Sequence, residues 1–520
     1  MTGNSPRPPN GGPDPERHGE RRFAAWTALL GYGALGAIMA AGQAPVGWWW
    51  ATIAALLVMF CALPLQAMPR SWGWRLWAAG TGYFAASLFW IVEPFFIEPE
   101  RHGWMAPFAL VLMAGGMALF WAVAGWMAAR LGHGRGRLVA LVAALITLEL
   151  LRGWIFTGFP WAMLGHVLVG TPLMQLAAFA GAGGLSLLVV VVAVLPALGR
   201  SMPQRGGAVL ASVALMGTLW VWGSTRTDLP APADHVVRLA QPNAPQAEKW
   251  QGDNPQRFFN RLLDQTAAPA SPAPALIVWP ETAVPFFLEY AGDGLAAMAQ
   301  AAHEHGPDTL LGFGVQRYDD GRYYNSLAIL DITARVTQVY DKHHLVPFGE
   351  YVPLSEFLLG SGLAGFAAQV LQGYSPGPGP ALLDFGPLGH ALPLICYESI
   401  FPRHLRGTER PDWVLQVTND AWFGEMTGPF QHLAQARLRA VEQGLPVLRS
   451  ANTGVSAVID ARGGLVAELG LGETGFLDAP LPAALPPTIY ARFGDVPLWG
   501  ALLAMLGTMA ALRWRHRTGA

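Results

Sequence analysis

Cysteine is scarce in this sequence: only two cysteines, Cys61 and Cys396, occur among its 520 residues. Cys61 lies in a long apolar run that is typical of a membrane-spanning segment, whereas Cys396 follows a short strand-like run in a region of mixed composition. A thiol inside a membrane cannot pair with a thiol in a water-facing domain, so we expect no internal disulfide. Cys396 is therefore either an inert core residue or a nucleophile.

Charged residues are also few. They make up 13% of this chain, against about 25% in an ordinary soluble protein, and hydrophobic residues make up 52%. This composition predicts that much of the chain lies in lipid. The formal net charge of −2 provides no basic face for a nucleic acid, so we expect no nucleic-acid partner.

Long apolar runs, by contrast, are plentiful. A helix needs about 20 largely apolar residues to cross a bilayer. We expect eight such helices, at residues 23–42, 47–65, 74–93, 105–129, 137–154, 173–198, 206–224 and 496–513. The chain then divides into a disordered polar tail, a seven-helix transmembrane domain, a water-facing domain, and a last helix with a basic tail. These parts cover residues 1–21, 22–224, 225–490 and 491–520.

Arginine residues predict the orientation of these spans. They gather before the first span, after the second, fourth and sixth spans, and after the eighth. The residues are Arg17, Arg21, Arg22, Arg70, Arg75, Arg130, Arg135, Arg137, Arg200, Arg205, Arg513, Arg515 and Arg517. Because basic loops stay in the cytoplasm, residues 225–490 are expected on the outer face. The alternative, in which one run does not span the membrane, would move this domain to the cytoplasm.

The water-facing domain alternates short apolar runs with helical segments, which is typical of a layered α/β fold. Three ionisable residues follow such runs: Glu281 in VWPETAVP, Lys342 in YDKHHLVPFGEYVP and Cys396 in LICYESIFP. Catalytic groups are commonly displayed at strand ends. A carboxylate can take the proton of a thiol, and a lysine can stabilise a thiolate or an oxyanion.

Each residue also has a structural interpretation. Glu281 could cap a loop, and Lys342 could lie in a solvated turn with His343 and His344. We expect no metal at the two histidines, because adjacent residues rarely share a metal ion and Cys396 is distant in sequence.

The three ordered motifs resemble the Glu–Lys–Cys signature of the nitrilase (carbon–nitrogen hydrolase) superfamily. With AQPNAPQAEKW, YYNSL, VTNDAWFGEMTGPFQH and RSANTGVSAVID, set between seven spans and one, the sequence is similar to the apolipoprotein N-acyltransferase family from about residue 22 onward. The resemblance implies an αββα sandwich on an eight-helix membrane base. It also implies that Glu281 is the general base, Lys342 the oxyanion stabiliser and Cys396 the nucleophile.

Further site residues follow from the same resemblance. Glu350, Tyr397, Glu398 and Asn325 correspond to supporting residues of the active site. Trp250 and Trp422 correspond to substrate-binding or loop positions, although both could be ordinary packing residues.

The resemblance implies a multi-pass enzyme of the bacterial inner membrane with its catalytic domain on the periplasmic face. It would move an acyl chain from a phospholipid, through a cysteine thioester, to the amine of a diacylglyceryl apolipoprotein. We expect no cofactor and a monomer. Two alternatives stay open: a membrane-tethered amidase or nitrilase, and a transporter or scaffold with an inactive outer domain. A transporter should carry ionisable groups along its spans, and only Glu149 and Arg152 stand out there.

Overall fold

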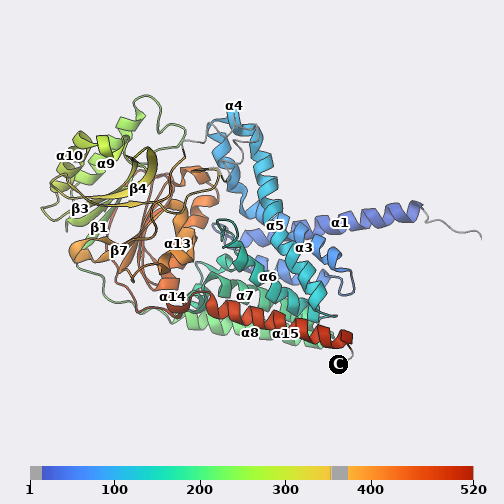
Figure 1. The fold of residues 1–520 in the computed structure, drawn as a ribbon. Coiled ribbons are helices and arrows are strands. Elements are labelled where there is room, and N and C mark those ends of the chain that lie inside the picture. The colour runs from blue at the N-terminus through green and yellow to red at the C-terminus, as the bar shows by residue number, and fades with distance from the viewer. Residues whose placement is uncertain (1–14, 352, 354–372, 519–520) are drawn as a thin grey trace, which may run out of the picture.

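The computed structural model describes residues 15–351, 353 and 373–518. Figure 1 shows two parts, a sandwich of two sheets and a bundle of helices beside it. The N-terminal end of α1 and the C-terminal end of α15 both lie at the end of the bundle that points away from the sandwich. Of the tail predicted over residues 1–21, residues 1–14 fall outside the described part, and residues 15–21 are already helical.

One main helix occupies each predicted span. They are α1 (Pro15–Met39), α2 (Trp49–Ala62), α3 (Pro69–Ser87), α5 (Ala106–Leu131), α6 (Gly136–Arg152), α7 (Ala177–Leu198), α8 (Met202–Ser224) and α15 (Val496–Thr518). Five stretches of the described chain are helical, long and apolar enough to cross a membrane: Phe23–Gly42, Pro99–Leu131, Pro172–Leu198, Met202–Ser224 and Val496–Arg515. α2 is apolar but shorter.

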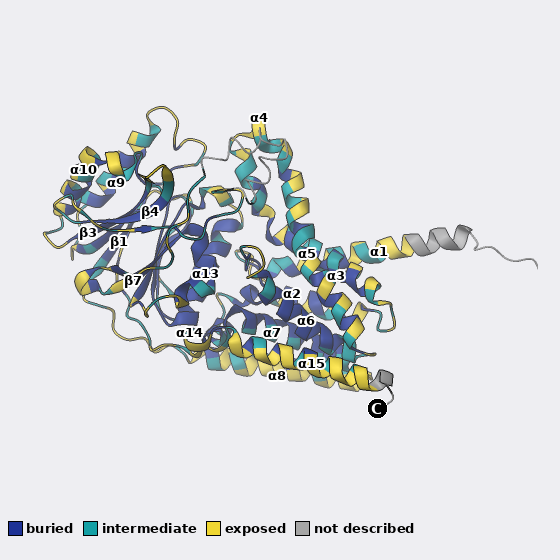
Figure 2. Ribbon diagram, in the orientation of Figure 1, coloured by how far each residue is buried: buried dark blue, intermediate teal, exposed yellow. Residues whose placement is uncertain are grey.

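Apolar side chains cover the outside of this bundle. In Figure 2 the outward faces of α8 and α15 are largely exposed, and large side chains such as Leu210 and Leu503 lie on them. A soluble protein rarely exposes such continuous apolar faces, whereas lipid-facing helices must expose them. The bundle therefore belongs in a membrane.

The loop between α6 and α7, residues 155–172, lies largely inside the protein. Residues 160–168, which include the short helix η4 (Leu164–Leu168), are buried inside the protein. The tip is open, where Phe156 is fully exposed. The loop is apolar because it packs between the bundle and the sandwich.

The sandwich has two six-stranded sheets, ordered β12-β1-β2-β3-β4-β5 and β11-β10-β9-β8-β7-β6. The strands are β1 (Val236–Gln241), β2 (Pro274–Val278), β3 (Leu310–Asp319), β4 (Arg322–Leu330), β5 (Val336–Asp341), β6 (Leu383–Asp384), β7 (His390–Ile395), β8 (Trp413–Thr418), β9 (Val447–Ala451), β10 (Ser456–Ile459), β11 (Leu465–Leu469) and β12 (Gly475–Pro480). Three neighbouring strands in each sheet are parallel: β1, β2 and β3 in one, and β7, β8 and β9 in the other. Such central strands need cover on both faces.

Helices provide the outer layers. α9 (Asn254–Ala267) and α10 (Gly292–His303) cover the first sheet through Leu262 and Met298, and α13 (Gly428–Gln443) covers the second through Ala436. A third apolar core lies between the sheets. The order of layers is helix, sheet, sheet, helix, as the family resemblance implies.

A break in α7 joins the two parts of the protein. Gly181 has φ +60, and a side chain there would meet the ring of Tyr490 at 2.3 Å. The break frees the backbone N–H of Ala182, which donates to Glu442 Oε1 of α13 at 3.0 Å. A carboxylate at a helix N-terminus is favourable because the partial charge there is positive. The sandwich therefore caps a helix of the bundle.

Candidate active site

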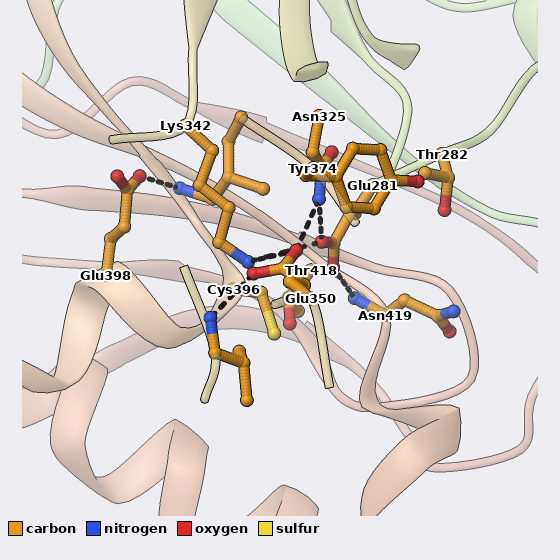
Figure 3. Close-up of polar contacts among 12 residues, drawn as sticks. Glu281, Thr282, Asn325, Lys342, Glu350, Tyr374, Cys396, Glu398, Thr418 and Asn419 are labelled. Carbon is orange, nitrogen blue, oxygen red and sulfur yellow. Dashed lines mark hydrogen bonds and ion pairs between the residues drawn. The ribbon is translucent and has the colours of Figure 1, made fainter. Parts of the chain in front are cut away.

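Three strand ends bring the three predicted residues together. Glu281 follows β2, Lys342 follows β5 and Cys396 follows β7, and the three side chains are 6%, 1% and 6% exposed. Lys342 Nζ lies 3.8 Å from Glu281 Oε1, and Figure 3 shows the Cys396 thiol beside them. Because β2 and β5 belong to one sheet and β7 to the other, the site forms where the two sheets face each other.

Both oxygens of Glu281 are bound. Oε1 accepts from Asn325 Nδ2 at 2.7 Å, and Oε2 accepts from the backbone N–H of Asn419 at 2.8 Å. Burial raises the pKa of this carboxyl and Glu350 raises it further, although Lys342 and the two hydrogen bonds oppose them. A raised pKa makes Glu281 a stronger proton acceptor than an exposed glutamate.

Lys342 is paired with a second carboxylate. Its Nζ donates to Glu350 Oε1 at 2.9 Å, and Glu350 is itself oriented by hydrogen bonds from Asn325 and from the backbone N–H of Val346. Burial opposes the charge on Lys342, but Glu350 and Glu281 outweigh it and raise its pKa. Lys342 is therefore a permanent cation, suited to stabilise an oxyanion and unsuited to act as a base.

Cys396 lies at a sharp turn, where β7 ends and the short helix η8 (Cys396–Ile400) begins. Its φ is +51, a left-handed conformation that costs a residue other than glycine about 1–3 kcal/mol. Burial and Glu281 raise the pKa of the thiol, against the effects of Lys342 and Thr418. The thiol is therefore protonated at rest and needs a base to become nucleophilic.

Glu398 organises the two loops that carry Lys342 and Cys396. Its carboxylate accepts from the backbone N–H groups of His343 at 2.9 Å, His344 at 3.1 Å and Ile395 at 2.8 Å. Burial opposes its ionisation, but hydrogen bonding and charge at His343 and the N–H of Ile395 outweigh this and lower its pKa to about 2. Glu398 is thus an ionised positioning residue.

Tyr397 connects the turn at Cys396 to the bundle. Its hydroxyl donates to the carbonyl oxygen of Gly158 at 3.0 Å, in the loop after α6. The side chain is buried, so this hydrogen bond is shielded from water.

Trp250 and Trp422 are more exposed than the residues of this cluster. They are 45% and 40% exposed, and within the described residues no hydrogen bond joins either side chain to the cluster. Their predicted roles at a pocket or loop stay predictions.

Thr418 and Asn419 are not among the predicted site residues. A hydrogen bond with Thr418 lowers the pKa of the Cys396 thiol, and the backbone N–H of Asn419 donates to Glu281. Thr418 is the last residue of β8, the neighbour of β7, and Asn419 follows it, so the rule that active groups follow strands could have found them.

Two family descriptions match this chain. Residues 237–487 match "Carbon-nitrogen hydrolase", and residues 35–195 match "Apolipoprotein N-acyltransferase N-terminal domain". The first range contains the sandwich and the whole cluster, and the second covers most of the bundle before it.

Relatives match over nearly the whole length. The apolipoprotein N-acyltransferase of Caulobacter vibrioides is 38% identical over 479 residues, which is 88% of this chain and 89% of that protein. The enzyme of the same name from Bradyrhizobium diazoefficiens is 39% identical over 484 residues, covering 87% and 86%. That from Allorhizobium ampelinum is 38% identical over 515 residues, covering 94% and 96%. The chain thus belongs to the apolipoprotein N-acyltransferase family, a family of acyltransferase enzymes in the carbon–nitrogen hydrolase superfamily.

Proposed function

We propose that Cys396 takes an acyl chain from a membrane phospholipid in the first half-reaction. Glu281 accepts the thiol proton while sulfur attacks the ester carbonyl, and the charge that develops on the carbonyl oxygen is stabilised by Lys342. The C–O bond then breaks, Glu281 returns the proton to the departing oxygen, and a lysophospholipid leaves. The acyl chain remains on Cys396 as a thioester.

The second half-reaction transfers this acyl chain to an amine. The free α-amine of a diacylglyceryl apolipoprotein attacks the thioester carbonyl, and Glu281 accepts the proton that the amine loses. The C–S bond breaks, the proton returns to sulfur, and the product is an amide. A thioester divides a difficult ester-to-amide exchange into two easier steps.

The position of the nucleophile turn is the observation that carries this proposal. Cys396 belongs to the core between the sheets, whereas the next residue, Tyr397, and also Ile400 pack into the core of the helical bundle. The reactive thiol therefore lies at the boundary where the sandwich meets the membrane part. Two lipid-anchored substrates confined to one leaflet would meet at such a boundary in restricted orientations.

The same proposal includes the membrane arrangement. All eight main helices cross the inner membrane. Five of them belong to the longer apolar stretches, and the other three are α2, α3 and α6. The sandwich faces the periplasm. The basic loops and the common side of the two chain ends support this orientation.

The test uses the full-length protein in native membranes with a phospholipid that carries a labelled acyl chain. Mass spectrometry should find the label on Cys396, and Cys396→Ser should abolish the thioester. A diacylglyceryl peptide with a free N-terminus should then remove the label, whereas the same peptide with an acetylated N-terminus should not. An unlabelled Cys396, the result expected of an amidase, would contradict the proposal.

A further inference from the structure

A second group of polar side chains lies behind the nucleophile, on the side of α13. Ser399 Oγ is 2.9 Å from His432 Nε2, and His432 Nδ1 is 2.9 Å from Asp420 Oδ1. All three residues are buried, and Ser399 is 2% exposed. The spacing is that of a serine–histidine–aspartate triad, in which a histidine held by an aspartate contacts a hydroxyl.

The protonation states of Asp420 and His432 determine which atoms of this group donate hydrogen bonds and which accept them. Burial opposes ionisation of Asp420, but Arg449 and His432 outweigh it and lower its pKa to about 2. An ionised carboxylate only accepts, so His432 carries its proton on Nδ1 and offers Nε2 as an acceptor. Gln416 Nε2 can donate to His432 Nε2 at 3.1 Å and to Ser399 Oγ at 2.6 Å.

The hydroxyl of Ser399 is directed at Cys396. Its hydrogen is donated to the main-chain carbonyl oxygen of Cys396 at 2.9 Å. His432 Nε2, which has no hydrogen to donate, lies 3.2 Å from the same oxygen and accepts from Gln416, the side chain that also donates to Ser399. That carbonyl belongs to the residue whose φ is +51. A strained backbone conformation persists only where its surroundings determine it, and this carbonyl is held by a buried polar network.

We propose that Ser399, His432 and Asp420 position the nucleophile, by fixing the carbonyl of Cys396 so that its thiol faces Glu281 and Lys342. The inference rests on the proposed role of Cys396. It also assigns Ser399 a role other than attack, because its hydroxyl is buried and donates to a carbonyl.

Ring contacts and hydrogen bonds from the helical bundle support this network. The ring of His432 lies 5.6 Å from that of Trp161, which is itself 4.6 Å from that of Trp90. The neighbouring Gln431 accepts from both indole N–H groups, at 2.7 Å from Trp161 and 3.3 Å from Trp90, and donates to the carbonyl oxygen of Ser87. Adjacent residues of α13 thus bind the bundle and the nucleophile turn.

The experiment measures the rate at which labelled phospholipid acylates Cys396 in the full-length protein, over a range of lipid concentrations. Ser399→Ala removes one hydroxyl and is matched by Ser456→Ala, a buried serine whose hydroxyl instead donates to Gln241. Displacement of a reacting group by about 1 Å costs on the order of 100-fold in rate. We therefore expect Ser399→Ala to lower the maximal acylation rate by about 10- to 100-fold with the half-saturating lipid concentration unchanged, and Ser456→Ala to stay within about twofold of wild type.

Two substitutions of His432 separate positioning from folding. His432→Gln places its side-chain amide near the position of Nε2, where it can still contact Ser399. His432→Asn places its amide near the position of Nδ1, where it keeps only the hydrogen bond to Asp420. We expect the glutamine variant to retain more of the acylation rate, at equal thermal stability.

The outcomes are distinguishable. Equal acylation rates for Ser399→Ala and Ser456→Ala, or an acyl group found on Ser399 of the wild-type protein, would overturn the inference. Absence of any adduct on wild-type Cys396 would instead refute the proposed function.

Discussion

Lys342 is paired more closely with Glu350 than with Glu281: its Nζ lies 2.9 Å from Glu350 Oε1 and 3.8 Å from Glu281 Oε1. Asn325 donates to both carboxylates, at 2.7 Å to Glu281 and 3.1 Å to Glu350. Glu350 therefore balances most of the lysine charge, and Glu281 keeps the capacity to accept a proton. The two glutamates have different tasks because of this difference in distance.

Glu350→Gln should shift the pH dependence of acylation. Glu350 contributes to the raised pKa of Glu281, so its neutralisation lowers that pKa. The acid limb of the rate profile should move to lower pH, and the maximal rate should fall by about 10- to 100-fold, because Glu281 becomes a weaker base. Acylation rates measured between pH 4 and 9 test this, with Glu468→Gln on the edge strand β11 as the control. An acid limb that moves to higher pH would contradict it.

Glu281→Gln should remove the base while preserving the local structure, since the amide oxygen can still accept from Asn419. Loss of a general base costs about 100- to 10,000-fold. The acylation rate should fall by that amount, and the thermal midpoint should change little. A variant that acylates Cys396 at the wild-type rate would show that another group takes the thiol proton.

Glu398→Gln should destabilise the protein in a pH-dependent manner. The pKa of Glu398 falls from 4.5 to about 2 on folding, so its ionised form stabilises the fold by roughly 3 kcal/mol. This contribution is fully present above pH 4.5 and is lost as the pH falls towards 2. The difference in unfolding free energy between wild type and variant should thus be largest near neutral pH and shrink below pH 4.5. A difference independent of pH would contradict the ionised state.

Gly181→Ala should destabilise the junction between bundle and sandwich. The positive φ costs alanine about 1 kcal/mol, and the added methyl group would also displace the ring of Tyr490. Gly207→Ala on α8 is the matched control, because nothing lies within 4 Å of its new methyl group. We expect a lower thermal midpoint in detergent for the first variant and no decrease for the second.

The sequence predicted the catalytic strand ends because the strands are apolar runs that stop at polar residues. β9 is hard to predict from the sequence because Arg449 interrupts its apolar pattern, and that charge is tolerated only because it binds Asp420 from another segment. β12 is hard to predict because its exposed positions dilute the apolar signal, and because its partner β1 lies more than 200 residues away. Pairing over such distances leaves no local trace in a sequence.

The residues of the site also divide into those that the sequence predicts and those that only the fold reveals. Glu281, Lys342 and Cys396 could be selected from their motifs, since the proposed reaction requires those residue types. The task of Glu398 could not, because it binds backbone N–H groups, which every residue except proline provides. His432 and Asp420 are ordinary polar residues in sequence, and only the fold places them behind the nucleophile.

The cap on α7 has a consequence for biogenesis. Ala182 and Glu442 are 260 positions apart, so a ribosome that has just completed α7 has not yet made the carboxylate that completes its N-terminus. The bundle can reach its final packing only after the sandwich has been translated and folded. A chain truncated before residue 442 should therefore insert into the membrane without completing the packing of its helical bundle. Quality-control proteases would then encounter an incompletely packed bundle.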